Sequence, residues 1–248
     1  MADYLLIDVG NGRAKLGLAS ADTIHEHRDL PTAEITPETL QEAVRGWSFD
    51  RVVACSVVPR VIPSLSGAFG GSLTVLRHDT PMPIGIRYPK PESIGPDRLA
   101  NAIALSAMHV TPGKPGIVLD FGTAVTFDIL SEDNCYIGGV IAPGLRLMTD
   151  YLHERTALLP RVHLHEPTTA IGQSTEGAIL AGAGFGYRGM IRGILDALRK
   201  ELPQGDEARV VSTGGDAEWI VSGMVEIQAV DPDLTLHGLR LVGNWTRI

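Results

Sequence analysis

One short pattern occurs twice in this chain, and it restricts the possible folds more than any other feature. Residues 6–10 read Leu-Ile-Asp-Val-Gly, and residues 118–122 read Val-Leu-Asp-Phe-Gly. In each copy an apolar strand pattern ends in an aspartate, a turn with glycine follows, and a second strand pattern begins. The repeat predicts one strand-turn-strand unit that is used twice within 248 residues.

Strand and helix patterns alternate along the rest of the chain. The expected strands cover residues 4–9, 13–20, 23–30, 52–58, 73–77, 117–120, 123–130, 136–141 and 209–212. The expected helices cover residues 37–47, 98–110, 145–158 and 176–202, and a last one begins at Asp216. This alternation favours an α/β fold with two related domains.

A break rich in proline and glycine at residues 111–116 is the best candidate for a domain boundary. It predicts an N-terminal domain over 1–112 and a C-terminal domain over 113–248. The expected helix over 176–202 contains six glycines, five of them between residues 182 and 193, and glycines cost stability in a helix interior. They indicate either close packing against a partner helix or second subunit, or two shorter helices with a break.

The net charge of −8 and the pI of about 5.4 argue against a broad basic surface for nucleic acid. No segment has the length of a membrane span, and the N-terminus lacks the pattern of a signal peptide, so we expect a cytoplasmic protein without a membrane partner. Cys55 and Cys135 lie in apolar runs, which favours buried thiols in a reducing compartment, although a disulfide stays open.

The first candidate site follows the first strand. Glycine has no Cβ, so a glycine turn lets backbone N–H groups approach phosphate oxygens. Asp8 would hold a hydrated Mg²⁺, and Lys15 would place a positive charge near the phosphates. The plain structural alternative is a β-hairpin with a type I′ turn. The residues of this candidate loop are Asp8, Val9, Gly10, Asn11, Gly12, Arg13, Ala14 and Lys15.

The second candidate site is the matching turn of the second copy. Asp120 can bind a cation, and the hydroxyls of Thr123 and Thr126 can bond phosphate or water. Two such turns that face each other across a cleft would suit a nucleoside triphosphate. A weaker candidate is Thr213-Gly214-Gly215-Asp216, a turn between strand and helix that would let an adenine or ribose approach the backbone.

A third candidate is Gly95-Pro96-Asp97-Arg98, at the start of an expected helix. Asp97 would act as a general base for a substrate hydroxyl, and Arg98 would grip a carboxylate or phosphate in a bidentate manner. The structural alternative is that Asp97 is simply the N-cap of the helix.

Taken together, these segments resemble the type III pantothenate kinases. The resemblance runs from Asp8 to Leu239 and includes DVGNGRAKLGL, GPDR, DFGTAVTFDIL, YIGGVIAPG, IGQSTEGAILAGAGFGYRGMI, STGGDAEWI and PDLTLHGL, in order. That family belongs to the actin-like ATPase superfamily, with acetate and sugar kinases as distant relatives. The resemblance implies two related actin-like (ribonuclease H-like) domains with a nucleotide cleft between them.

The resemblance also implies a reaction, which is the phosphorylation of pantothenate by ATP in the first step of coenzyme A synthesis. By position, Asp97 matches the base that accepts the hydroxyl proton, and residues 8–15 match the phosphate loop. Asp120 matches the ligand of a monovalent cation, K⁺ or NH₄⁺, and Thr123 matches an ATP contact. Family members are dimers. The positions that match pantothenate contacts are Tyr88, Gly95, Pro96, Asp97, Arg98 and Thr175.

One position departs from the family pattern, whose first loop reads DxGNT or DxGNS. Here Gly12 replaces the hydroxyl residue. Loss of one such contact would cost about 1–3 kcal/mol of phosphate binding or transition-state stabilisation. The departure keeps an alternative open, in which the chain is a weak or inactive relative with a regulatory or accessory binding role. A kinase of the same superfamily with another acceptor is a further alternative.

Overall fold

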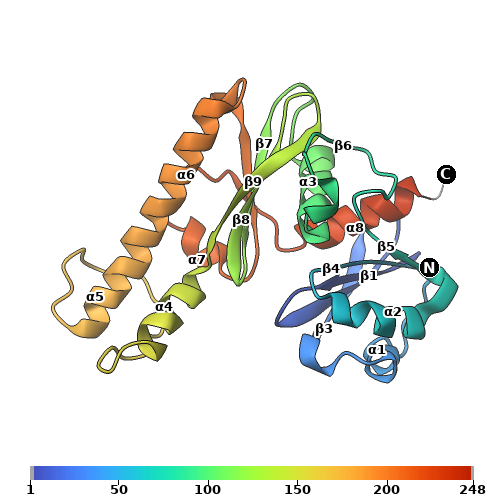
Figure 1. Cartoon of the computed structure of the whole chain (residues 1–248), viewed down its shortest axis with the longest axis horizontal. Helices are drawn as coiled ribbons and strands as arrows, with labels where there is room; N and C mark the ends of the chain where they lie inside the picture. The colour runs from blue at the N-terminus through green and yellow to red at the C-terminus, as the bar shows by residue number, and fades with distance from the viewer. Residues whose placement is uncertain (1–2, 247–248) are drawn as a thin grey trace. The chain divides into compact units, whose positions relative to one another are not determined.

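The computed structural model describes residues 3–246 and divides them into two compact units (Figure 1). Unit 1 contains the chain up to His109, the short segment Asn134–Gly138 and the chain from Asp233 onward. Unit 2 contains Val110–Asp133 and Gly139–Pro232. The domain boundary expected between residues 112 and 113 stays a prediction.

Unit 1 is built on a five-stranded sheet with the strand order β3-β2-β1-β4-β5. β1 pairs antiparallel with β2 and parallel with β4. The strands are β1 (Tyr4–Val9), β2 (Arg13–Ala19), β3 (Ile24–Pro31), β4 (Arg51–Ser56) and β5 (Leu73–Val75). The helices are α1 (Pro37–Ala43), α2 (Ile62–Phe69), α3 (Pro96–Met108) and α8 (Leu234–Trp245).

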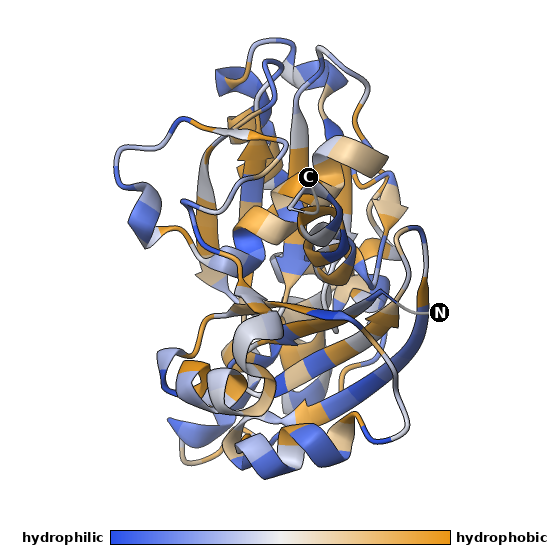
Figure 2. Cartoon of the chain, turned by 90° about the vertical axis from the view of Figure 1, so that its right-hand side faces the viewer, coloured by the Kyte–Doolittle hydropathy of each residue, from blue (hydrophilic) through white to orange (hydrophobic). Residues whose placement is uncertain are grey.

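The two faces of this sheet are covered by different helices. Alternate residues of β1, among them Leu5 and Ile7, join Leu40 of α1 and Leu65 of α2 in one buried apolar cluster. The other face is covered by α3 and α8, which cross closely: a Cβ on Gly238 would lie 2.0 Å from the carbonyl oxygen of Ala100. In Figure 2 the strands of this sheet carry both hydrophobic and hydrophilic residues, and the helices beside them are likewise of mixed colour.

Unit 2 repeats the topology of unit 1. Its strands follow the order β9-β8-β7-β10-β11, with β7 antiparallel to β8 and parallel to β10. This confirms the strand-turn-strand unit that the repeated sequence pattern predicted. The strands are β7 (Gly116–Phe121), β8 (Ala124–Leu130), β9 (Cys135–Pro143), β10 (Arg209–Thr213) and β11 (Ala229–Val230). The first residues of β9 group with unit 1, where Cys135 and Tyr136 pair with the short strand β6 (Gly85–Ile86).

The helices of unit 2 are α4 (Leu145–Glu154), α5 (Thr175–Ala181), α6 (Tyr187–Glu201) and α7 (Ala217–Val221). The glycine-rich stretch between α5 and α6 forms a π-helical segment, Gly182–Gly186, so the expected long helix is continuous but locally wider. Short 3₁₀ helices cover Thr32–Glu34, Pro59–Val61, Gly70–Ser72, Pro91–Ser93 and Gly205–Glu207.

Several boundaries differ from the sequence expectation for local reasons. α1 ends at Ala43 rather than at Trp47, because Val44 is its C-cap and Gly46 takes a positive φ of 83°. α4 ends at Glu154 rather than at Leu158. Just after this end, the hydroxyl of Thr156 donates to the carbonyl oxygen of Leu152 at 2.7 Å, so a side chain bonds a carbonyl group of the last helical turn. The helices α2 and α8 were not expected.

Both cysteines are free thiols; Cys55 is buried and Cys135 is half-buried. Within residues 3–246, every helix is too short or too polar to span a lipid bilayer.

Candidate active site

The first glycine turn, residues 10–12, joins β1 to β2 as an open loop. The N–H of Gly10 donates to the carbonyl oxygen of Arg13 at 3.0 Å, which closes the hairpin. The hairpin expectation is therefore confirmed, but the type I′ turn is wrong, because neither Asn11 nor Gly12 has a positive φ.

The loop is braced from the end of β3. The buried Thr32 donates its hydroxyl to the carbonyl oxygen of Gly10 at 2.7 Å. Its backbone N–H donates to the carbonyl oxygen of Gly12 at 3.1 Å. A Cβ added at Gly12 would meet no atom within 4 Å, so the loop has room for a larger residue there.

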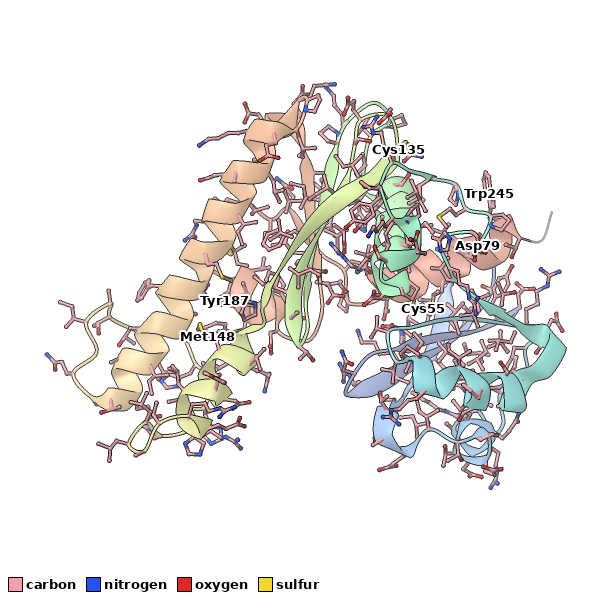
Figure 3. The ribbon with its side chains drawn as sticks, in the orientation of Figure 1. Cys55, Asp79, Cys135, Met148, Tyr187 and Trp245 are labelled. Atoms are coloured by element: carbon pink, nitrogen blue, oxygen red, sulfur yellow. The ribbon has the colours of Figure 1, made fainter. Side chains whose placement is uncertain are left out.

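Asp8 lies one residue before the end of β1, on the sheet face covered by α3 and α8. Its register partners are Lys15 on β2 and Cys55 on β4. The Cys55 thiol donates to Asp8 Oδ1, with 3.3 Å between sulfur and oxygen. Burial raises the pKa of this thiol well above its ordinary value, and the charges of Asp8 and then Asp97 raise it further. Cys55, which is labelled in Figure 3, therefore stays protonated as a donor to Asp8.

Asp97 occupies the first turn of α3. The N-cap is Gly95 and Pro96 takes the first helical position, so the alternative that Asp97 is the N-cap is wrong. Asp97 Oδ1 accepts the backbone N–H of Arg98 at 2.8 Å. Burial raises the pKa of the Asp97 carboxyl, while that hydrogen bond and the Arg98 charge lower it less. A carboxylate with a raised pKa is a stronger base, which suits proton abstraction from a hydroxyl.

Gly95 is required by close contact with the carboxylate. A Cβ at this position would lie 2.6 Å from Asp97 Oδ1 and 3.4 Å from Cγ of Arg98. Because Cys55 is close enough to feel the charges of both Asp8 and Asp97, unit 1 brings the loop carboxylate and the candidate base to one region.

Tyr88 joins the same region through an aromatic neighbour. Its ring packs edge-on against Tyr136, with 6.2 Å between the ring centroids. The guanidinium of Arg98 lies 5.9 Å from the Tyr136 ring centroid. Tyr88 is 37% exposed, and its ring passes close to Gly138. Tyr136, which the sequence did not mark, thus links two candidate pantothenate contacts.

In unit 2, the second glycine turn joins β7 to β8 and carries Asp120 and Thr123. Asp120 is half-buried in the penultimate position of β7, and Thr123 is exposed in the turn. Two other backbone turns press against this one. A Cβ on Gly144 would lie 2.4 Å from the carbonyl oxygen of Thr123, and one on Gly214 would lie 2.5 Å from backbone atoms of Phe121. Gly214 also has a positive φ of 96°, so both spacing and conformation require glycine.

An ion pair lies beside these turns. Arg146, in the first turn of α4, pairs with Asp216 at 2.8 Å. The hydroxyl of Tyr187 donates to the carbonyl oxygen of Pro143 at 3.2 Å, and Figure 3 shows this side chain directed from α6 toward the end of β9. Burial and the Asp216 charge raise the pKa of Tyr187 well above its usual range.

Thr175 is exposed at the first position of α5 in unit 2. The N-cap is Ser174, whose hydroxyl oxygen accepts the N–H of Gly177 at 3.0 Å. An open pocket next to it is lined by residues of the preceding segment and of α5, including Thr168, Ile171, Gln173 and Leu180. Thr175 and the candidate pantothenate contacts Tyr88 and Gly95–Arg98 belong to different units.

Comparison with known proteins assigns the family. The family model of type III pantothenate kinases matches residues 4–197. A type III pantothenate kinase of Akkermansia muciniphila is 47% identical over 239 residues, covering 96% of this chain and 97% of the relative. One of Methylacidiphilum infernorum is 41% identical, covering 96% and 87%. The chain belongs to the type III pantothenate kinase family.

A solved structure places this kinase family member among the actin-like folds. It is the activator of 2-hydroxyisocaproyl-CoA dehydratase from Clostridium difficile with bound ADPNP. The TM-score is 0.59 at 10% identity, over 100% of this chain and 95% of the other. The α/β actin-like fold class predicted from the sequence is thereby confirmed.

The donor chemistry of this pantothenate kinase family member fits hard cations. No group of three or more His, Cys, Asp or Glu side chains that could hold a metal ion occurs within residues 3–246. Asp8 and Asp120 instead offer single carboxylates at strand ends, and oxygen donors of this kind suit Mg²⁺ or K⁺ that keeps water and phosphate ligands.

Sequence reasoning missed three neighbours of the candidate residues: Cys55, Thr32 and Tyr136. Each lies far along the chain from the residue that it contacts. The pairing of β1 with β4 brings Cys55 to Asp8, and the chain after β3 brings Thr32 to the loop. The pairing of β6 with β9 brings Tyr136 close to Tyr88. Residues 52–55 form a continuous buried run, so nothing in this segment distinguished Cys55 from its neighbours.

Proposed function

We propose that this chain phosphorylates pantothenate at its primary hydroxyl with ATP, as the first step of coenzyme A synthesis. One observation carries most weight, namely that the chain matches the type III pantothenate kinase family over most of its length. The half-buried Asp97 beside Arg98 supports the same conclusion, because it supplies a base next to a group suited to a carboxylate substrate.

Phosphoryl transfer asks a protein mainly to align the reactants and to neutralise charge. Asp97 accepts the hydroxyl proton at a carboxylate oxygen as the hydroxyl oxygen bonds to the γ-phosphorus. The bond from that phosphorus to the β–γ bridging oxygen breaks, and ADP leaves with its electron pair. Arg98 holds the pantothenate carboxylate, with Tyr88, Gly95, Pro96 and Thr175 as further substrate contacts. Partial burial raises the pKa of the Asp97 carboxyl and so makes the carboxylate a stronger base.

The loop of residues 8–15 cradles the ATP phosphates with backbone N–H groups, and Lys15 adds a positive charge. Asp8 holds a hydrated Mg²⁺, Asp120 holds K⁺ or NH₄⁺, and Thr123 contacts ATP. These cations, when bound, neutralise phosphate charge that a protein of net charge −8 does not neutralise by its surface.

We further propose a homodimer formed through unit 2. Large exposed apolar side chains gather on α4 and on the π-helical segment before α6: Leu147, Tyr151 and Phe185 are each about half exposed. Gly182, Gly186, Gly189 and Gly193 recur on the neighbouring helical stretch, and an added Cβ at any of them would meet no atom within 4 Å. A second copy would cover this smooth apolar face. Phe185→Asp should convert the dimer to a monomer in analytical ultracentrifugation.

The decisive assay measures phosphopantothenate formation by purified protein with ATP and Mg²⁺, with and without K⁺ or NH₄⁺. We expect turnover that depends on the monovalent cation and falls at least about a hundredfold in Asp97→Asn. Glu92→Gln is the control, because Glu92 is exposed on the adjoining 3₁₀ helix. No turnover in a folded wild-type protein would reject the kinase and favour the accessory binding protein.

Gly12 is tested in the same assay. The open space around it admits the hydroxyl residue found in the family loop, so Gly12→Thr should raise kcat/KM for ATP by about tenfold. An unchanged value would mean that the backbone alone holds the phosphate here.

A further inference from the structure

Within unit 2, the hydroxyl of Thr213 is buried and has no hydrogen-bond partner. Thr213 is 1% exposed and ends β10, and its Oγ1 lacks any partner. A buried hydroxyl without a partner costs free energy, so such an atom in a folded protein calls for a ligand or a role. The inference drawn from it rests on the proposed function.

The strand register places this hydroxyl beside Asp120. Thr213 of β10 pairs with Asp120 of β7 in a parallel ladder, and Thr126 of β8 pairs with Asp120 from the other side. Register partners on neighbouring strands lie about 4.8 Å apart and direct their side chains to the same face. One row across the sheet therefore reads Thr213, Asp120, Thr126.

Thr126 already uses its proton. Its hydroxyl donates to Asp128 Oδ2 at 3.3 Å, so the Thr126 oxygen can act only as an acceptor or a cation ligand toward other groups. The row presents a carboxylate and two hydroxyl oxygens. One carboxylate with two neutral hydroxyl oxygens is a donor set of low charge, which suits the monovalent cation that the proposed function assigns to Asp120.

The backbone holds this row at a fixed spacing. The turn after Thr213 is pressed against β7, since a Cβ on Gly214 would lie 2.5 Å from Phe121 N and O. The N–H of Asp216 also reaches the carbonyl oxygen of Phe121 at 3.4 Å.

We propose that Thr213 is a ligand of the monovalent cation at Asp120, through its hydroxyl oxygen, with Thr126 completing the row from the opposite strand. The cation, K⁺ or NH₄⁺, supplies the partner that the buried Thr213 oxygen lacks. Thr213 is thus a second cation-binding residue, contributed by the other strand that flanks β7.

Thermal unfolding in KCl, in NH₄Cl and in choline chloride of equal ionic strength tests the site without turnover. Each titration is run on the full-length protein with and without ADP and Mg²⁺. In Thr213→Val the cation concentration for half-maximal stabilisation should rise at least about tenfold, because one oxygen ligand is lost. Thr213→Ser keeps the hydroxyl and should stay within about twofold of wild type.

Choline separates a folding defect from a ligand defect. In choline chloride, Thr213→Val should unfold at or above the wild-type temperature, since it removes a buried hydroxyl without a partner. The matched control is Thr149→Val, which deletes a buried hydroxyl that donates to Leu145 within α4 and should leave the cation dependence unchanged.

Two results would overturn the proposal. One is an unchanged K⁺ dependence in Thr213→Val, and the other is the absence of any K⁺- or NH₄⁺-specific stabilisation in wild type. Failure of the proposed function gives a different result. The protein would then not phosphorylate pantothenate, but K⁺ would still stabilise it in a manner that depends on Thr213, so the cation site would stand.

Discussion

The β1–β2 hairpin of unit 1 and the β7–β8 hairpin of unit 2 hold an aspartate at the same point of the same topology. Their neighbours across the sheet differ. Asp8 lies between Lys15 and Cys55, whereas Asp120 lies between Thr126 and Thr213. The first aspartate thus has a cationic side chain and a thiol donor as register partners, and the second has two hydroxyl groups.

The turns that follow the two aspartates differ as well. The first turn leaves open space around Gly12, and the second is pressed between the backbones at Gly144 and Gly214. A repeated scaffold thus carries two kinds of site. One supplies positive charge from the chain, and the other supplies neutral oxygens that suit an added cation.

The largest expected effect comes from removing each aspartate charge in turn. Asp8→Asn should lower kcat at least about a hundredfold at every K⁺ concentration, as expected when a preorganised charge contact is lost. Asp120→Asn should lower it less at high K⁺, because its defect is weaker cation binding. Steady-state kinetics over a K⁺ titration checks this, with the exposed Asp79→Asn as control. If Asp8→Asn and Asp120→Asn showed the same K⁺ dependence, the two aspartates would not have different roles.

The glycines of the two turns should differ in stability effects. Gly214→Ala should lower the free energy of unfolding by about 2–4 kcal/mol, since it combines a positive φ with a collision against Phe121. Gly12→Ala should leave it unchanged or raise it by up to about 1 kcal/mol. Urea denaturation measures both, and equal losses would show that the first turn is as constrained as the second.

A smaller effect is expected from the thiol next to Asp8. Cys55→Val should lower kcat/KM for ATP by about three- to tenfold, because Asp8 loses one hydrogen-bond donor. Cys55→Ser keeps a donor and should recover most of the loss. If both variants lose equally, packing rather than the hydrogen bond explains the effect.

The smallest effect is a shift in pH dependence at Asp97. Asp97 acts as a base only when it is deprotonated, so kcat/KM should fall as the pH drops through its raised pKa. That acid limb should therefore lie above the range of an ordinary aspartate. The Arg98 charge lowers this pKa, so Arg98→Gln should move the limb to higher pH. The pH profile of kcat/KM measures the position of this limb, with the exposed Arg45→Gln as control. A shift of the limb to lower pH in Arg98→Gln would contradict the assignment of Asp97 as the base.

Most of the strand positions could be read from the sequence, because the alternation of apolar residues reflects burial on one or both faces. β1 matches its expected range over 4–9, and β2, β3, β7 and β8 lie within three residues of theirs. α8 could not be read in the same way. Its apolar residues serve two partners, α3 and the sheet of unit 1, so its pattern is not that of a simple amphipathic helix.

The candidate site residues also differ in how far the sequence could identify them. Asp8, Asp97 and Asp120 were found because each is an acid at a strand end or helix start, beside glycine. Cys55 was not chosen as a site residue, and Thr213 was marked only as part of a candidate turn for adenine or ribose. Nothing in either segment shows which strand will lie beside it.

The sequence by itself determined the repeated strand-turn-strand unit, the position of each acid in its element, and the family. These depend on local patterns of burial and on residue order. Only the tertiary structure decided which residues flank each acid. Parallel pairing joins β1 to β4 and β7 to β10 across long stretches of chain, and the register of those pairs is set by packing. The chemical difference between the two aspartates is therefore a property of the fold.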